Sequence, residues 1–203
     1  MKRIVAVALA VAVATGGGWL VGADGWAPLD TDAASAQVRT TSALTPSCAT
    51  VRRPFNPKTV TIPGITSRAK VVTPPRLPGR VPGAPPLTEA GKEMFAWDKA
   101  SDVRPGDKQG VVRMNAHVWP DGSAVGNRML KNLEIGDRIV VRGKDRKLCY
   151  RVTDKVIVDA SKTLPRYYRT WGKPRLGIVV CSGKRLGPGV WTKRTVWFAK
   201  AQF

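Results

Sequence analysis

Three apolar stretches in the C-terminal half of the chain decide the fold class. They read Gly110-Val-Val-Arg-Met-Asn-Ala-His-Val-Trp119, Leu176-Gly-Ile-Val-Val-Cys181 and Arg194-Thr-Val-Trp-Phe-Ala199. Each is short and rich in β-branched or aromatic residues, which is typical of strands. Further strands are expected at 138–142, 148–153 and 156–158 and, upstream, at 59–62 and 69–72. Many short strands with little helix indicate an all-β barrel or sandwich.

The segment between the second and third expected strands is rich in proline. Residues 74–86 alternate proline with glycine and arginine, so they form neither a helix nor a central strand. We interpret them as a long surface crossover inside one domain spanning 58–203. A second linker is the alternative, and it would move the start of the domain to about residue 88. Residues 24–57 lack periodicity and are interpreted as a flexible tether.

The N-terminus predicts export. Lys2 and Arg3 precede an uncharged run from Ile4 to Gly22, which is 22 − 4 + 1 = 19 residues and near the length that spans a bilayer. Because the cations come first, the rest of the chain is expected outside the cytoplasm. We therefore expect residues 1–23 to be a membrane anchor. A cleaved signal peptide is the alternative, ending at Ala23 or within the triplet 34–36.

Composition limits the possible functions. The 203 residues carry 34 Lys+Arg against 14 Asp+Glu, a net charge of +20 that implies an anionic neighbourhood. Three scattered cysteines exclude a disulfide-built scaffold, and with a single histidine they make a zinc site improbable. Cys149 alternates with Leu148 and Tyr150 and is interpreted as a packing residue. A disulfide with Cys48 is its alternative in an oxidising compartment.

The end of the 176–181 strand is the candidate catalytic position. Cys181 ends an apolar strand and is followed by Ser182-Gly183, which begins a loop. The thiol is therefore expected to be held by a rigid backbone and to be exposed to solvent. A thiol nucleophile needs a lowered pKa or a nearby base, and His117 is the only imidazole in the chain. Arg194 opens the next strand, and a β-hairpin would return it beside Cys181 to stabilise a developing oxyanion.

These motifs resemble the sortase family, with the closest similarity to its actinobacterial class F-like group. The resemblance rests on Asn115-Ala-His-Val-Trp119, Gly126-Asn-Arg128, Leu133-Glu-Ile-Gly-Asp-Arg-Ile139, Leu148-Cys-Tyr-Arg-Val-Thr153, Val179-Val-Cys-Ser-Gly183 and Trp191-Thr-Lys-Arg-Thr195. The spacings agree as well, since 181 − 117 = 64 and 194 − 181 = 13. Two positions depart from the family pattern. Ala116 stands where a glycine is usual, and Ile178-Val-Val-Cys181 stands where Thr-x-Thr-Cys is usual.

The resemblance implies a closed eight-stranded β-barrel and a cysteine transpeptidase with His117, Cys181 and Arg194 as catalytic residues. It implies cleavage of an LPxTG-like motif in exported proteins and transfer to a cell-wall amine. This chemistry needs no cofactor, and no nucleic-acid partner is expected. Calcium helps some sortases, but the sequence has no compact acidic cluster to bind it, so no metal is expected. Val180, Trp191, Thr192 and Thr195 are the candidate substrate-binding residues. An L,D-transpeptidase or a papain-like hydrolase would order Cys and His differently. A non-catalytic basic module binding anionic wall polymer remains the alternative, and the net charge favours it.

Overall fold

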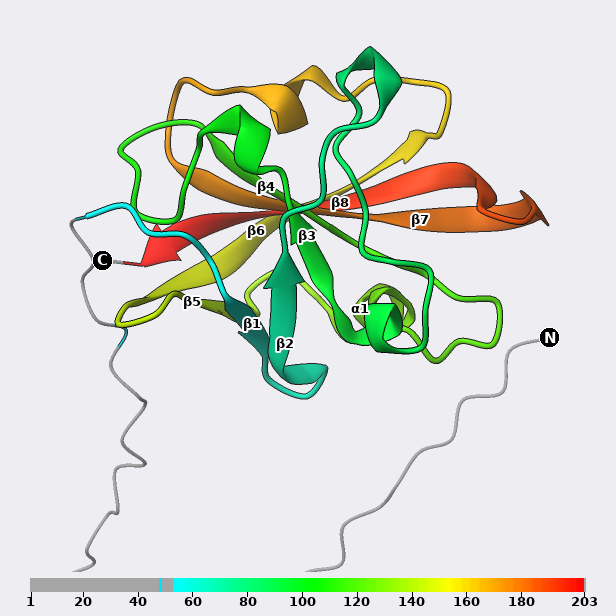
Figure 1. The fold of residues 1–203 in the computed structure, drawn as a ribbon, viewed down its shortest axis with the longest axis horizontal. Helices are drawn as coiled ribbons and strands as arrows, with labels where there is room; N and C mark the ends of the chain where they lie inside the picture. Colours follow the sequence, from blue (N-terminus) through cyan, green and yellow to red (C-terminus); the bar gives the residue numbers. More distant parts are fainter. Residues whose placement is uncertain (1–47, 49–52, 203) are drawn as a thin grey trace, which may run out of the picture. The chain divides into compact units, whose positions relative to one another are not determined.

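Eight strands close into a single barrel in the computed structural model, which describes Cys48 and residues 53–202 (Figure 1). The order around the barrel is β1-β2-β3-β4-β7-β8-β6-β5. The strands are β1 (Thr59–Ile62), β2 (Thr66–Val72), β3 (Phe95–Trp97), β4 (Val111–Ala116), β5 (Arg138–Arg142), β6 (Lys147–Asp159), β7 (Arg175–Gly187) and β8 (Val190–Gln202). The closed barrel predicted from the sequence is thereby confirmed. The strands expected at 148–153 and 156–158 are one continuous strand, β6.

Two of the neighbouring pairs, β2–β3 and β4–β7, are parallel. A parallel pair cannot be joined by a tight turn, so each needs a long connection. The connection from β2 to β3 is the proline-rich stretch, and it carries two short 3₁₀ turns, η1 (Pro78–Arg80) and η2 (Ala90–Glu93). Residues 74–86 are therefore a crossover inside the domain and not a second linker. We call residues 73–94 the crossover below.

The interior of the barrel holds one large apolar core. Alternate residues of each strand point inward, and Phe95, Trp97, Ile178 and Trp197 are among the fully buried side chains. Phe55 belongs to the same core, three residues before the boundary expected at residue 58. A second, smaller apolar cluster lies on the outer face of the sheet, made by Val111, Tyr167, Val196 and Phe198. It is covered by the turn η4 (Pro165–Tyr168) in the connection from β6 to β7.

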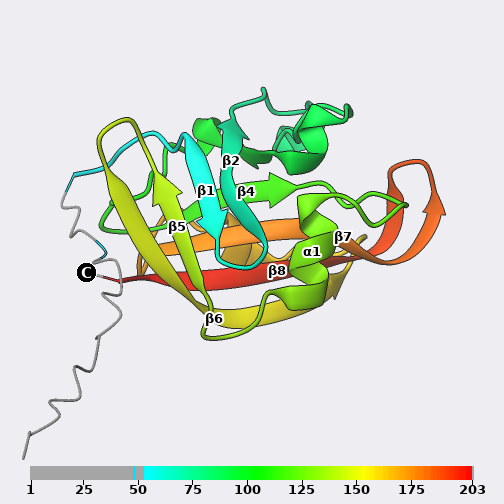
Figure 2. The ribbon, with the colours of Figure 1, turned by 90° about the horizontal axis from the view of Figure 1, so that it is seen from below.

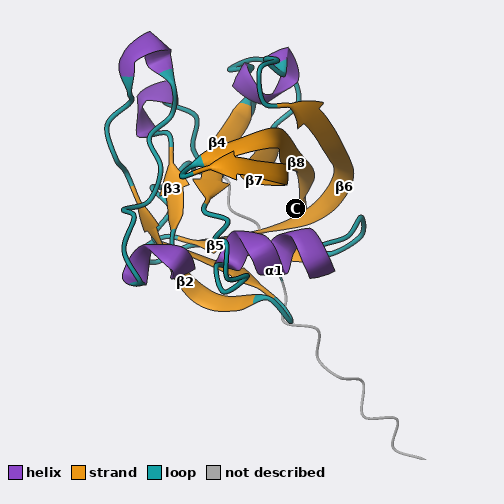
Figure 3. Cartoon of the chain, turned by 90° about the vertical axis from the view of Figure 1, so that its right-hand side faces the viewer, coloured by secondary structure: helices purple, strands orange, loops and turns teal. Residues whose placement is uncertain are grey.

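One α-helix that the sequence did not predict follows β4. Helix α1 (Val125–Asn132) buries Val125, Gly126 and Met129, and it lies beside the barrel in contact with β7 and η2 (Figure 2). Its eight residues include Gly126, two asparagines and a β-branched valine, all weak helix formers. Packing therefore makes this helix, not propensity. The strands (orange) curl into the barrel with the helical segments (purple) around it (Figure 3).

A disulfide joins Cys48 to Cys149 on β6, with an S–S distance of 1.96 Å and a Cα–Cα distance of 5.5 Å. The interpretation of Cys149 as a simple packing residue is therefore wrong, and the alternative pairing is the one found. Cys149 does follow the alternation expected of a strand, but its sulfur forms a disulfide with Cys48. Cys181 is the free cysteine of the chain.

The expected membrane segment, residues 4–22, lies outside the described residues. Among the residues that are described, no helix is long and apolar enough to cross a bilayer.

Candidate active site

His117, Cys181 and Arg194 come from three neighbouring strands of the barrel. Cys181 of β7 pairs directly with Arg194 of β8 across an antiparallel ladder. On the other side of β7, Ala116 pairs with Val180 in a parallel ladder, so His117 follows β4 level with Cys181. Adjacent strands lie about 4.8 Å apart, which makes the three residues one row across the sheet. Residues 178 and 180 point into the core, so the alternation of β7 turns Cys181 to the outer face, while its half-buried side chain still packs against the edge of the core cluster. The predicted trio is thus brought together on one outer face.

The thiol of Cys181 is half-buried where β7 leaves the barrel. Burial raises the pKa of Cys181 above its ordinary value, and the positive charge of Arg194 opposes that rise. The surroundings of Cys181 therefore favour the neutral thiol over the thiolate. Arg194 is the charge that favours the thiolate.

The guanidinium of Arg194 is fastened to its own hairpin. Its Nη1 donates to the carbonyl of Lys193 at 3.0 Å and to the carbonyl of Trp191 at 3.3 Å. The hairpin itself extends past the barrel (Figure 1) and is bulged between Ser182 and Arg185. Nη1 is thereby engaged with the backbone of the hairpin, and Nε and Nη2 are the guanidinium donors without a partner among the described residues.

The backbone of His117 is held by helix α1. The carbonyl of His117 accepts the N–H of Gly126 at 3.0 Å. The side chain of Asn127 bridges both backbone groups of Trp119, accepting from its N–H at 2.8 Å and donating to its carbonyl at 3.0 Å. A Cβ on Gly126 would lie 2.2 Å from the oxygen of His117, so only glycine permits this approach. The Gly126-Asn127 pair quoted from the sequence is thus the support of the histidine.

The imidazole of His117 meets the crossover. Its Nε2 lies 2.7 Å from the carbonyl oxygen of Pro85. Its ring also stands edge-on to Trp119, with 5.9 Å between the ring centroids. Within the described part of the chain, the hydrogen bond of this ring is to Pro85 and not to the Cys181 thiol.

The four candidate substrate-binding residues occupy two different environments. Val180 and Thr195 point inward and are 2% and 1% exposed, so they present almost no surface to a ligand. The hydroxyl of Thr195 donates to that of Ser182 at 2.9 Å, directly beneath the nucleophile. Trp191 and Thr192 are half-buried in the hairpin, and Thr192 accepts the N–H of Lys184 at 2.9 Å. Val179 and Val196 lie two residues from Cys181 and Arg194 and belong to the outer apolar cluster, where Val196 is itself buried.

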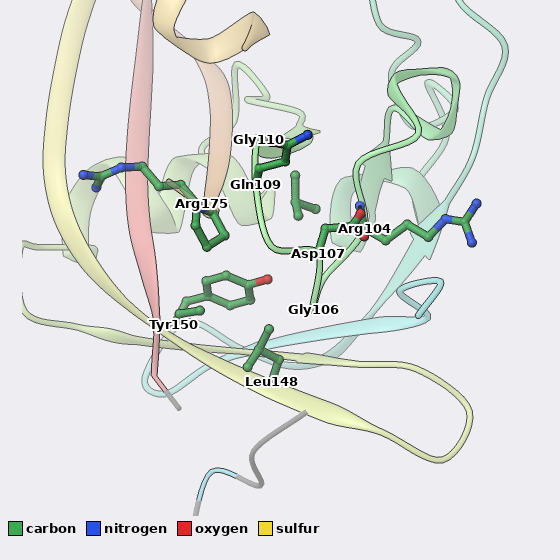
Figure 4. Close-up of a pocket in the computed structure, with 11 residues that line it drawn as sticks. Arg104, Gly106, Asp107, Gln109, Gly110, Leu148, Tyr150 and Arg175 are labelled. Carbon is green, nitrogen blue, oxygen red and sulfur yellow. Dashed lines mark hydrogen bonds between the residues drawn. The ribbon is translucent and has the colours of Figure 1, made fainter. Parts of the chain in front are cut away.

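A separate small pocket lies at the other end of these strands (Figure 4). Tyr150 points across it, and Arg104, Gly106, Asp107 and Arg175 are among its walls. Its lining includes the starts of β4 and β7, whereas His117 and Cys181 lie toward their later residues. This pocket is therefore not part of the candidate active site.

Comparisons with known proteins identify the architecture. No protein-family model matches the chain, and no curated protein matches it. Solved structures do match. Sortase A of Listeria monocytogenes has a TM-score of 0.50 and 16% identity, with 71% of this chain and 86% of that chain covered. Sortase C1 of Streptococcus suis has a TM-score of 0.52 and 15% identity, with 73% of each chain covered. Sortase C1 of Streptococcus agalactiae has a TM-score of 0.52 and 15% identity, with 71% and 67% covered.

The described residues have the sortase fold. At this level of identity the sortase likeness concerns the backbone, and the functional assignment depends on the side chains of this chain itself. The sequence motifs predicted Cys181, His117 and Arg194 as the candidate site residues, and the structure places all three on neighbouring strands. They gave no role to Pro85 or to Asn115, because the contacts of these residues are made between segments about 30 residues apart.

Proposed function

We propose that the chain is a sortase-type cysteine transpeptidase that acts on exported proteins bearing an LPxTG-like motif. The observation that carries the proposal is the single row of His117, Cys181 and Arg194 on the outer face of a sortase-fold barrel. The sequence motifs around the trio further resemble the actinobacterial class F-like group.

The chemistry requires two acyl transfers. The Cys181 thiolate attacks the threonine carbonyl carbon of the motif and forms an S–C bond, while Arg194 donates hydrogen bonds to the oxyanion. The C–N bond then breaks, and His117 gives a proton to the departing amine. A cell-wall amine attacks the resulting thioester and gives one proton to His117, the S–C bond breaks, and the Cys181 thiolate and the protonated imidazole return. Water in place of the amine gives slow hydrolysis.

Two further features support an extracytoplasmic site of action. Disulfides persist in oxidising compartments, and Cys48–Cys149 is such a bond. The N-terminal run Ile4 to Gly22 is long enough to anchor the chain in a membrane. We therefore place the barrel outside the cell membrane, where sorting-motif proteins and wall amines would both be available.

The test is acyl-enzyme capture with an LPxTG peptide, followed by intact-mass measurement. The parent should gain the mass of the acyl fragment, and Cys181→Ala should gain none. The double variant Cys48→Ser/Cys149→Ser is the matched control and should still form the thioester, because it leaves the trio untouched. Acylation that persists in Cys181→Ala would overturn the proposal. A parent that binds anionic wall polymer and forms no thioester with any sorting peptide would instead identify the non-catalytic basic module.

A further inference from the structure

Every second residue from Arg113 to His117 faces outward from β4 or its extension. Each of these three residues is linked to the crossover. Arg113 contacts Asp98, whose two oxygens accept from Arg76 of the crossover at 2.8 Å each. Asn115 donates from Nδ2 to the carbonyl of Gly83 at 2.8 Å. His117 places Nε2 2.7 Å from the carbonyl of Pro85. The crossover is thus fastened along this strand at intervals of two residues, ending on the imidazole.

The crossover is packed firmly enough to act as a fixed support. Gly83 and Pro85 are both buried. A Cβ on Gly83 would lie 2.3 Å from the carbonyl oxygen of Pro75, so the segment folds closely on itself at that point. The prolines have restricted φ angles, which reduces the number of other conformations open to the segment.

We propose that the Pro85 carbonyl fixes the tautomer of His117, and that Asn115 is the positioning residue that holds this carbonyl in place. A carbonyl oxygen only accepts hydrogen bonds, so Nε2 must carry the proton at 2.7 Å. The neutral ring then has Nδ1 free of a proton. In this assignment Nε2 keeps its proton and its hydrogen bond to Pro85, and Nδ1 is the nitrogen that gains and loses a proton.

This assignment deepens the proposed function and rests on it for its catalytic meaning. In the transfer step, Nδ1–H of the imidazolium gives its proton to the departing amine nitrogen, and the ring returns to the Nε2–H tautomer. Throughout, the Nε2–H bond to Pro85 stays intact and keeps the ring from turning. Fixing the tautomer matters because an imidazole with its proton on the wrong nitrogen cannot perform the transfer.

The first experiment needs no variant. His117 is the single histidine of 203 residues, so the ¹⁵N resonances of a histidine-labelled chain report this ring alone. With the ring neutral, the parent should show a pyrrole-type Nε2 and a pyridine-type Nδ1. A dominant Nδ1–H tautomer would overturn the inference, whatever the activity. The expected tautomer in a chain that forms no thioester would leave the inference intact and count against the proposed function instead.

The second experiment removes the donor of Asn115. Asn115→Asp keeps the shape but turns a carboxylate oxygen toward the Gly83 carbonyl, and Asn115→Ala removes the contact. Both should mix the two tautomers and lower kcat by up to about 10²-fold with a smaller change in KM. The exposed Asn132→Ala, at the end of α1, is the control and should change neither. Variants that fold as the parent does, keep the pure Nε2–H tautomer and keep the parent kcat would remove Asn115 from this role.

Discussion

The half-buried thiol of Cys181 feels two opposing influences. Removal from water disfavours the thiolate and raises the pKa, while the facing guanidinium of Arg194 favours the thiolate. Burial is the larger influence, so the surroundings of Cys181 favour the neutral thiol. In the proposed mechanism, the charge of Arg194 and the imidazole of His117 would have to offset it.

Replacing Arg194 with Gln should raise the pKa of Cys181 further. The side chain that lowers this pKa would be gone and the burial would remain. Alkylation by iodoacetamide should then be slower than in the parent at pH 8, and the two rates should converge as pH rises. Arg185→Gln is the matched control, since Arg185 is exposed further along the same hairpin. Identical pH profiles for Arg194→Gln and the parent would show that Arg194 does not act on the thiol.

Replacing Arg194 with Lys should be far from conservative. A planar fork can donate two hydrogen bonds to one oxyanion while staying fastened to its own backbone, whereas an ammonium is a point charge on a flexible stem. The loss of an oxyanion donor typically costs about 10²–10³ in turnover. Steady-state rates should show this loss in kcat more than in KM, because the charge exists only in the transition state. Lys193→Arg, the exposed neighbour, should retain the parent rate. If Arg194→Lys keeps more than half the parent rate, Arg194 is not the residue that stabilises the oxyanion.

At the scale of residues, the sequence spacing predicts that the three residues of the candidate trio are neighbours, because strand pairing places residues at matching distances from a turn opposite one another. A hairpin centred near residue 188 must place 181 against 194, and the structure has that register. The same logic could not reach Cys149. Its alternation with Leu148 and Tyr150 reports only which way the side chain faces, and the partner, Cys48, is 101 residues away.

Helix α1 is the element that joins the fold to the site. Its second residue contacts the backbone of His117, and its third fastens Trp119. The sequence could not predict it, because a helix of eight residues is too short to be stable alone, and the packing that stabilises it comes from other segments. The crossover, by contrast, was predictable, since its prolines exclude both regular structures.

Gly126→Ala should destabilise the protein, although alanine is the better helix former. Helix propensity favours alanine by about 1 kcal/mol. The added Cβ would lie 2.2 Å from the backbone oxygen of His117, which cannot move without displacing the strand. Overpacking of this kind costs about 1–3 kcal/mol, so the clash wins. Denaturant unfolding should show the loss, together with slower acyl-enzyme formation.

Gly187→Ala is the matched control for this change. Nothing lies within 4 Å of a Cβ at Gly187, and its φ is not in the left-handed region. Its free energy of unfolding should stay within about 0.5 kcal/mol of the parent. Equal stability of Gly126→Ala and Gly187→Ala would mean that α1 can shift away from His117 freely.

For the whole barrel, two features contribute to the free energy of unfolding: the large apolar core and the disulfide that closes a long loop of the chain. The eight-stranded closure followed from a series of short strands and from the family resemblance, but the sequence patterns alone left barrel and sandwich open. Closure depends on which strands become neighbours, and the two parallel pairings are set by contacts far apart in the chain. The core also reaches Phe55, whose single apolar side chain gave no periodic signal.

The variant Cys48→Ser/Cys149→Ser should unfold at a lower denaturant concentration than the oxidised parent. The bond closes a loop with a sequence separation of 101, so its loss should cost about 2–5 kcal/mol. Peptide turnover should change little, because Cys149 pairs with Gln202 whereas Arg194 lies eight residues earlier on β8 (202 − 194 = 8), roughly 27 Å along the strand. Adding reductant to the parent should reproduce the variant, and an unchanged midpoint in both would contradict the role of the bond.

The same cross-link changes what a single proteolytic cut can do. Cys48 and the barrel are connected twice, once by the peptide chain through residues 49–52 and once through the sulfur bridge to β6. One cut between residues 48 and 53 would leave the upstream segment attached to the barrel until a reductant arrived. If that segment holds the chain in a membrane, as the sequence leads us to expect, shedding the enzyme by such a cut would require a protease and a reducing agent together.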